Sequence, residues 1–340
     1  GVTNFYMGKY EKAIADTLEH LRLEPDDVMG YGNLVVQYTA LNRLAEAKSA
    51  YQDAVKRKLE EAGLHANRYG VAFLEGDEAE MERQVQWATG KMGAEDMLLS
   101  LSSDTEAFYG RLSKARALSL RAIDSARRNN QPETAAGWQM NSALREAEFG
   151  NSGEARKIAS SPVVSTRDAQ ILATLALARA GASLEAERLA KNLAKSSPSD
   201  TLIVNYWLPS ISAAVAIDRG NPSKAIEILQ AATPYELGEP YPMFQAGGSL
   251  YPVYLRAQAH LMLRQGAEAA AEFQKVLDHR GILMNCAFGA LAHLGLARAY
   301  ALQGQMPRSR SEYQQFFRIW KDADTNIPIL EQAKAEYERL

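Results

Sequence analysis

Apolar residues recur every three to four positions along most of this 340-residue chain. That spacing places them on one face of an α-helix. Alanine and leucine dominate the periodic stretches, and most of the 12 prolines fall between them. Because alanine and leucine favour helices, the pattern predicts an all-α chain of short amphipathic helices with negligible strand content.

A glycine or asparagine followed five residues later by a residue that is usually small, most often alanine, recurs along the chain. The first four such positions are spaced 34 residues apart, at Gly8, Asn42, Gly76 and Gly110. Later positions follow at less regular steps, at Gly150, Gly181, Gly220 and Gly304. The long gap before Gly304 conceals one more unit, which contains Ala269 and Phe273. We therefore expect about nine helix-turn-helix units, the first of them incomplete.

The chemistry of each repeated position explains the pattern. Glycine and asparagine accept the left-handed backbone that commonly ends a helix. The small residue five positions later lies on the second helix, where it allows the two backbones of a unit to approach closely. A larger apolar residue four positions further on, such as Tyr51 or Phe273, shares the same helical face.

The 34-residue period and the residues at fixed positions resemble tetratricopeptide (TPR) repeats. Tyr31, Leu34 and Tyr38 follow the spacing of the first TPR helix, as do residues 293–300, and Pro25 and Pro198 stand where that family places its closing proline. The resemblance implies an α-α superhelix, or TPR solenoid, over residues 1–325. An insertion rich in aromatic residues, proline and glycine interrupts it at 233–252, and residues 326–340 form a capping helix.

Residues 249–282, 290–305 and 313–337 look like the C-terminal TPR region of large bacterial multidomain serine/threonine protein kinases. The same kind of region follows winged-helix DNA-binding domains in other bacterial regulators. The first residue is glycine, and the first repeat begins partway through a helix, so we expect this chain to be a piece of a longer protein. The resemblance implies the sensor or scaffold end of a signalling protein, without kinase activity in this piece.

The composition of the chain serves mainly to exclude some classes of partner and location. The formal net charge of −3 predicts no strong attraction to nucleic acid or to an acidic membrane. The apolar runs, such as 171–178, are much shorter than the ~20 residues that span a bilayer, so we expect no membrane insertion by this segment. The expected location is cytoplasmic, or extracytoplasmic if a membrane span precedes Gly1.

A search for catalytic motifs finds none. The chain lacks the glycine-rich phosphate loop and the catalytic-loop and metal-binding aspartates of a kinase, and it has no Walker-type phosphate loop. None of the five histidines pairs with another histidine or with Cys286 at metal-ligand spacing. We therefore expect no catalytic residues, no metal and no cofactor in this chain, and we expect it not to be an enzyme.

In TPR arrays the first helices of successive units line a concave groove, and the family register identifies its positions here. The predicted groove is apolar and aromatic, and it is formed by Met97, Met140, Leu144, Ile171, Trp207, Tyr251, Tyr254, Gln258 and Arg298. Such a surface suits a protein or peptide partner. The alternatives are an intramolecular spacer or regulator of an absent kinase or DNA-binding domain, and a small-molecule sensor that uses the 233–252 segment.

Overall fold

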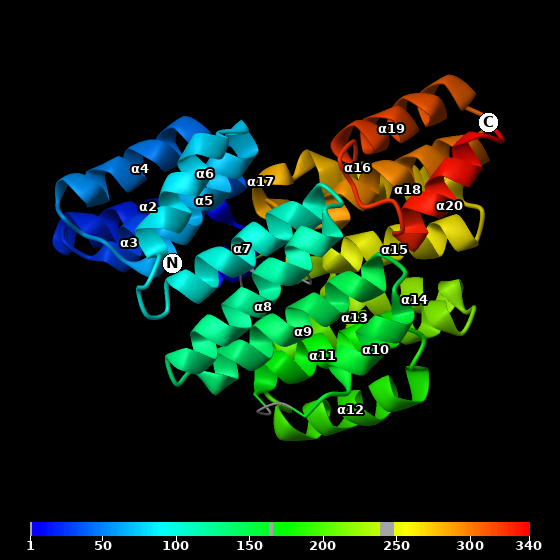
Figure 1. Ribbon diagram of the computed structural model, residues 1–340, viewed down its shortest axis with the longest axis horizontal. Helices are drawn as coiled ribbons and strands as arrows, with labels where there is room; N and C mark the ends of the chain where they lie inside the picture. Colours follow the sequence, from blue (N-terminus) through cyan, green and yellow to red (C-terminus); the bar gives the residue numbers. More distant parts are fainter. Residues whose placement is uncertain (1, 163–165, 239–247) are drawn as a thin grey trace.

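The computed structural model of the chain describes residues 2–162, 166–238 and 248–340, and every regular element in these ranges is a helix. The predicted all-α class is therefore confirmed for this part of the chain. Successive helices form hairpins that stack side by side into a curved array (Figure 1).

The helices of the described ranges form nine consecutive pairs with four additional short elements. The pairs are α1 (Val2–Tyr6) with α2 (Tyr10–Leu23), α3 (Val28–Ala40) with α4 (Leu44–Lys56), α5 (Ala62–Glu75) with α6 (Glu78–Ala88), α7 (Glu95–Phe108) with α8 (Leu112–Arg128), α9 (Pro132–Glu148) with α10 (Ser152–Ala159), α11 (Arg167–Arg179) with α12 (Ser183–Ser196), α13 (Leu208–Asp218) with α14 (Pro222–Leu229), α15 (Tyr251–Met262) with α16 (Gly266–Asp278), and α18 (Phe288–Leu302) with α19 (Met306–Ile319). The additional elements are a π-helical turn η1 (Ile203–Trp207), a 3-10 turn η2 (Gln230–Tyr235), the short helix α17 (Arg280–Leu283) and the final helix α20 (Pro328–Tyr337).

The predicted turn positions have the backbone that their residue types favour. All eight glycine and asparagine positions have positive φ, from +57° at Asn42 to +88° at Gly150. In the concealed unit Arg264 takes this place, with φ +57°, five residues before Ala269. The residue five positions after each turn is buried in every unit. Ser309 is the polar one among them, and its hydroxyl donates to the Ala297 carbonyl at 2.8 Å. The repeat register is thus confirmed.

The array closes on itself, because its C-terminal elements contact its N-terminal half. In and after α17, the Arg280 guanidinium donates to the Leu74 carbonyl at 2.6 Å, and the Asn285 amide donates to the Leu101 carbonyl at 2.8 Å. Near the C-terminus the Trp320 indole donates to the Phe108 carbonyl at 3.0 Å. Figure 1 shows α17 beside the α5–α7 region, and α20 at the right of the view beside α18.

The last helix, α20, joins two parts of the array. It packs against α19, and Leu330 and Ala333 are buried. At its start the Ile329 amide donates to the Phe149 carbonyl at 3.3 Å, which ties α20 to the fifth helix pair. The helix therefore covers the last unit and also holds the ring of units closed.

The 233–252 insertion is described only at its two ends, and Tyr241 and Phe244 lie outside the described residues. At the first end the Tyr10 hydroxyl donates to the Leu237 carbonyl at 2.7 Å, so the first unit contacts the seventh. At the second end the Tyr251 side chain is fully buried. Both described ends therefore fold back against neighbouring helices.

Candidate functional site

The structure places the nine predicted groove residues on inner helices but buries most of them. The buried side chains are Met140, Leu144, Ile171, Trp207, Tyr251 and Tyr254. Those that keep partial exposure are Met97, Gln258 and Arg298. The expectation that aromatic residues such as Trp207 and Tyr254 face outward into an open groove is therefore wrong.

The physical reason is that the inner helices pack against one another, both between consecutive units and between units three positions apart. The Phe288 ring of α18 lies 5.6 Å from the Tyr251 ring and 5.1 Å from the Tyr254 ring, between centroids. The Tyr251 hydroxyl donates to the carboxylate of Glu148, three units earlier in the chain. These contacts belong to one hydrophobic core that contains residues from Ala107 to Ala333, contributed by both helices of the units.

An opening lies on the inner side, and we call it the inner cavity. It has a volume of about 300 Å³ and lies between the fifth and sixth helix pairs on one side and the eighth and ninth pairs with α20 on the other. Tyr254, Gln258 and Arg298 line it, so the structure brings together three of the predicted residues there. Leu261 and Leu291 supply part of the apolar wall.

The charged groups of the inner cavity neutralise one another. The Arg179 guanidinium donates to both carboxylate oxygens of Glu148, at 2.6 and 3.1 Å, and Arg298 does the same to Glu336, at 2.8 and 3.1 Å. Burial opposes the Arg179 cation, but the attraction of Glu148 outweighs it and raises the pKa of the guanidinium above its usual value. Because both arginines are already paired, the cavity offers no free cation to hold a peptide's terminal carboxylate.

Burial also keeps the cavity's phenol neutral. Desolvation, aided by the nearby Glu148 carboxylate, raises the pKa of Tyr254 well above its ordinary value of 10. The lining of the inner cavity therefore consists of neutral polar groups, arginine–glutamate ion pairs and aliphatic side chains. This surface fits an amphipathic peptide segment better than a charged terminus.

The histidines take structural positions. The His65 ring stacks on Trp87 with 3.4 Å between centroids, and burial lowers the pKa of His65. His293 pairs with Glu312 at 2.8 Å. Within residues 2–162, 166–238 and 248–340, no group of three or more His, Cys, Asp or Glu side chains is arranged to hold a metal ion.

A second depression, on the outer side between α8 and α10, was not predicted from the sequence. Its apolar wall comes from Leu120, Ile123 and Ile158. The signal in the sequence is the short distance from Gly150 to Pro162, which leaves room for a second helix much shorter than the one that follows Gly110.

Comparison with known proteins gives distant structural likenesses only. No protein-family model and no curated protein matches the sequence. Among solved structures, the chain is similar to yeast Tom70, with 11% identity and a TM-score of 0.43, over 99% of this chain and 86% of that one. It is also similar to a tetratricopeptide repeat protein from Parabacteroides merdae, with 16% identity and a TM-score of 0.37, over 86% of this chain and 93% of that one.

The class of fold follows from the helix pairs themselves. Hairpins of about 34 residues, left-handed turns between their helices and a buried small residue five positions later define TPR-like repeats. In the described part of the chain, none of the helices is both long enough and apolar enough to cross a bilayer.

Proposed function

We propose that this chain is a non-catalytic protein-interaction module, the scaffold or sensor part of a larger bacterial signalling protein. The observation that carries the proposal is the inner cavity, an opening of about 300 Å³ between inner helices of units that are distant in the sequence. Its paired charges and aliphatic wall suit a peptide segment that inserts one or two side chains. Gln258 and Arg298 are the predicted residues best placed to contact it.

The second candidate function is an intramolecular one, in which the chain spaces or regulates a kinase or DNA-binding domain of its parent protein. The observation in its favour is the ring closure, because contacts such as Trp320 with Phe108 give a repeat array the rigidity that a spacer needs. A small-molecule sensor is a further alternative, since the cavity volume lies at the lower end of the range for ligand pockets.

A photo-crosslinking experiment tests the proposal. A benzophenone amino acid replaces Gln332, which is exposed at the rim of the inner cavity, and in a control protein it replaces Leu184, which is 80% exposed on the outer helix α12. In cells that make the parent protein, irradiation is expected to give a discrete protein adduct from position 332 and none from position 184. No adduct from position 332, or the same adducts from both positions, contradicts a peptide site at the cavity.

A further inference from the structure

The outer depression between α8 and α10, which we call the outer groove, has a volume of about 420 Å³. Its floor is α9 and its walls are α8 and α10. Three aliphatic side chains line it: Leu120, Ile123 and Ile158. Leu120 is 62% exposed, so one wall presents an apolar side chain to solvent.

The outer groove exists because two equivalent helices differ in length. The turn glycines Gly110 and Gly150 align α8 with α10, so that Ser119 in α8 corresponds to Ala159, the last residue of α10. Helix α8 has 17 residues and α10 has 8. At 1.5 Å per residue, α8 therefore extends roughly 13 Å beyond the point where α10 ends. The apolar face of that extension, including Leu120, is left without a neighbouring second helix.

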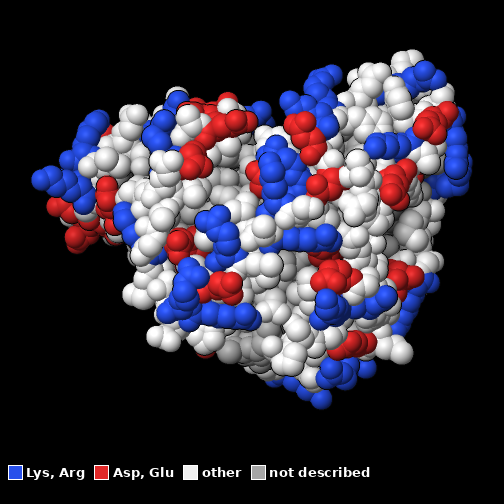
Figure 2. Space-filling model, viewed as in Figure 1, with Lys and Arg blue, Asp and Glu red and all other residues white. Residues whose placement is uncertain are grey.

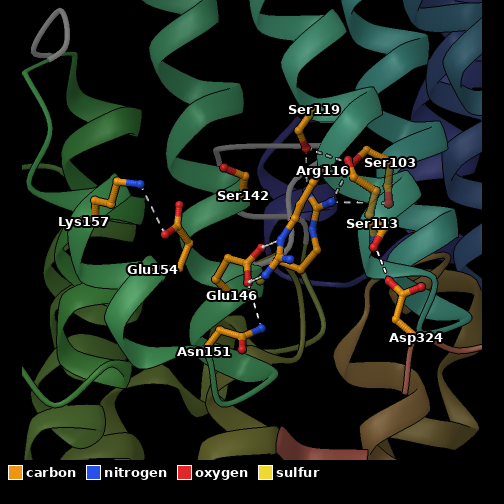
Figure 3. Close-up of polar contacts among 12 residues, drawn as sticks. Ser103, Ser113, Arg116, Ser119, Ser142, Glu146, Asn151, Glu154, Lys157 and Asp324 are labelled. Atoms are coloured by element: carbon orange, nitrogen blue, oxygen red, sulfur yellow. Dashed lines mark hydrogen bonds and ion pairs between the residues drawn. The ribbon is translucent and has the colours of Figure 1, made fainter. Parts of the chain in front are cut away.

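The polar groups under the outer groove are satisfied by each other. Figure 3 shows the Arg116 guanidinium directed at Glu146, with two hydrogen bonds of 2.7 Å, and the Asn151 amide donating to the same carboxylate at 2.9 Å. It also shows Ser119 bonded to Ser103, at 2.8 Å. A ligand therefore gains few hydrogen bonds from the floor of the groove. Its binding depends on contacts with the aliphatic walls and with the charged groups at the rim.

The wall of the outer groove that α8 forms is basic. Helix α8 carries five basic residues and one acidic residue, Asp124. Glu146 neutralises Arg116, but Arg127 donates to the neutral amide oxygen of Gln139 at 3.3 Å, so its charge is uncompensated there. Arg121 is exposed on the same helix but does not line the groove. On the α10 side the lining residue Glu154 is paired with Lys157 at 3.5 Å. Figure 2 shows Lys and Arg side chains gathered over the part of this face where α8 lies.

We propose that the outer groove docks an acidic amphipathic helix of a partner protein. Aliphatic side chains spaced three to four residues apart on that helix pack against Leu120, Ile123 and Ile158, and its carboxylates pair with Arg127 at the rim. The groove is apolar and lacks aromatic rings on which bases could stack, so it fits a helix better than a single-stranded nucleic acid. This site is on the outer side of the array and is independent of the inner cavity.

Fluorescence polarisation with defined peptides tests the proposal. The probe is a labelled helical peptide of about 18 residues, or five turns, with leucine at every third or fourth position and glutamate and alanine elsewhere. It is expected to bind the full chain, and a scrambled peptide of the same composition and a version with lysine for glutamate are each expected to bind at least about tenfold more weakly. Leu120→Glu is expected to weaken binding of the acidic probe about tenfold or more.

Two variants complete the test. Leu184→Glu changes a leucine outside the groove that is even more exposed than Leu120, and it is expected to leave binding unchanged. The variant Arg127→Glu is expected to weaken the preference, so that the lysine peptide and the glutamate peptide bind with more similar affinities. The proposal is overturned if the acidic probe does not bind, if Leu120→Glu has no effect, or if a labelled oligonucleotide binds at this face and the peptide does not.

Discussion

We expect the Trp207→Ala substitution to lower the free energy of unfolding by about 3–5 kcal/mol, because it removes a fully buried indole from a packed core. The Trp207 ring lies against the Tyr206 ring in an edge-to-face contact, with 5.0 Å between centroids. Both side chains come from η1, at the start of the seventh helix pair, so the cavity would open inside the array. Urea unfolding followed by circular dichroism at 222 nm measures the change.

Two further variants serve as controls for this measurement, one at a buried position and one at an exposed position. Phe273→Ala removes a buried ring that packs closely on Gly295, and it is expected to cost a similar 3–5 kcal/mol. Leu184→Ala changes an exposed side chain and is expected to stay within about 0.5 kcal/mol of the wild type. If Trp207→Ala behaves like Leu184→Ala instead of like Phe273→Ala, then Trp207 faces an open groove and the closed inner face described here is incorrect.

The second large effect is expected from Arg145→Met, at about 3–5 kcal/mol near neutral pH, because it leaves a buried carboxylate without its cation. Arg145 lies 3.3 Å from the Asp104 carboxylate, and Asn141 donates to both oxygens of that carboxylate at 3.2 Å. These residues join α7 to α9 inside the array and are almost completely buried. Removing the guanidinium therefore destabilises the packing of the fourth unit on the fifth.

The pH dependence of this variant gives a sharper test. Burial raises the pKa of Asp104 to about 6, against the opposing effects of Arg145 and Asn141. A carboxyl whose folded pKa lies above its unfolded value of ~3.9 adds stability as the pH falls through the folded pKa and loses it as the pH rises. Without Arg145 the pKa of Asp104 rises further, so the deficit of Arg145→Met is expected to be smaller at pH 5 than at pH 7.5.

Controls separate this pair from general acid effects. In Asp104→Asn/Arg145→Met no carboxyl remains at position 104 to titrate. The stability deficit of this double variant relative to the wild type should therefore not shrink between pH 7.5 and pH 5 in the way expected for Arg145→Met. Arg219→Met breaks a largely exposed ion pair with Glu187, and it is expected to cost less than about 1 kcal/mol at either pH. A deficit for Arg145→Met that is the same at pH 5 and pH 7.5 would show that Asp104 is not the group responsible.

The sequence by itself determined the repeat. Gly76 and Asn42 mark turns because a left-handed backbone is a local property, decided by whether a side chain tolerates positive φ. Ala47 and Ala115 are buried because each packs within its own hairpin, against residues fewer than 40 positions away. Such short-range constraints leave a periodic pattern that one sequence shows directly, and they also predict that Gln258 and Arg298 lie on inner helices.

Only the tertiary structure decided whether those inner helices face solvent. The curvature of a solenoid is the sum of a small rotation at each unit, and no single position encodes the total. Here the sum brings Tyr251 to Glu148 and Trp320 to Phe108, pairs more than 100 residues apart, so the Tyr251 side chain is buried and does not face an open groove. The outer groove likewise depends on where α10 ends relative to α8. The difference in length between these helices produces a groove only when the two helices lie side by side in the folded chain.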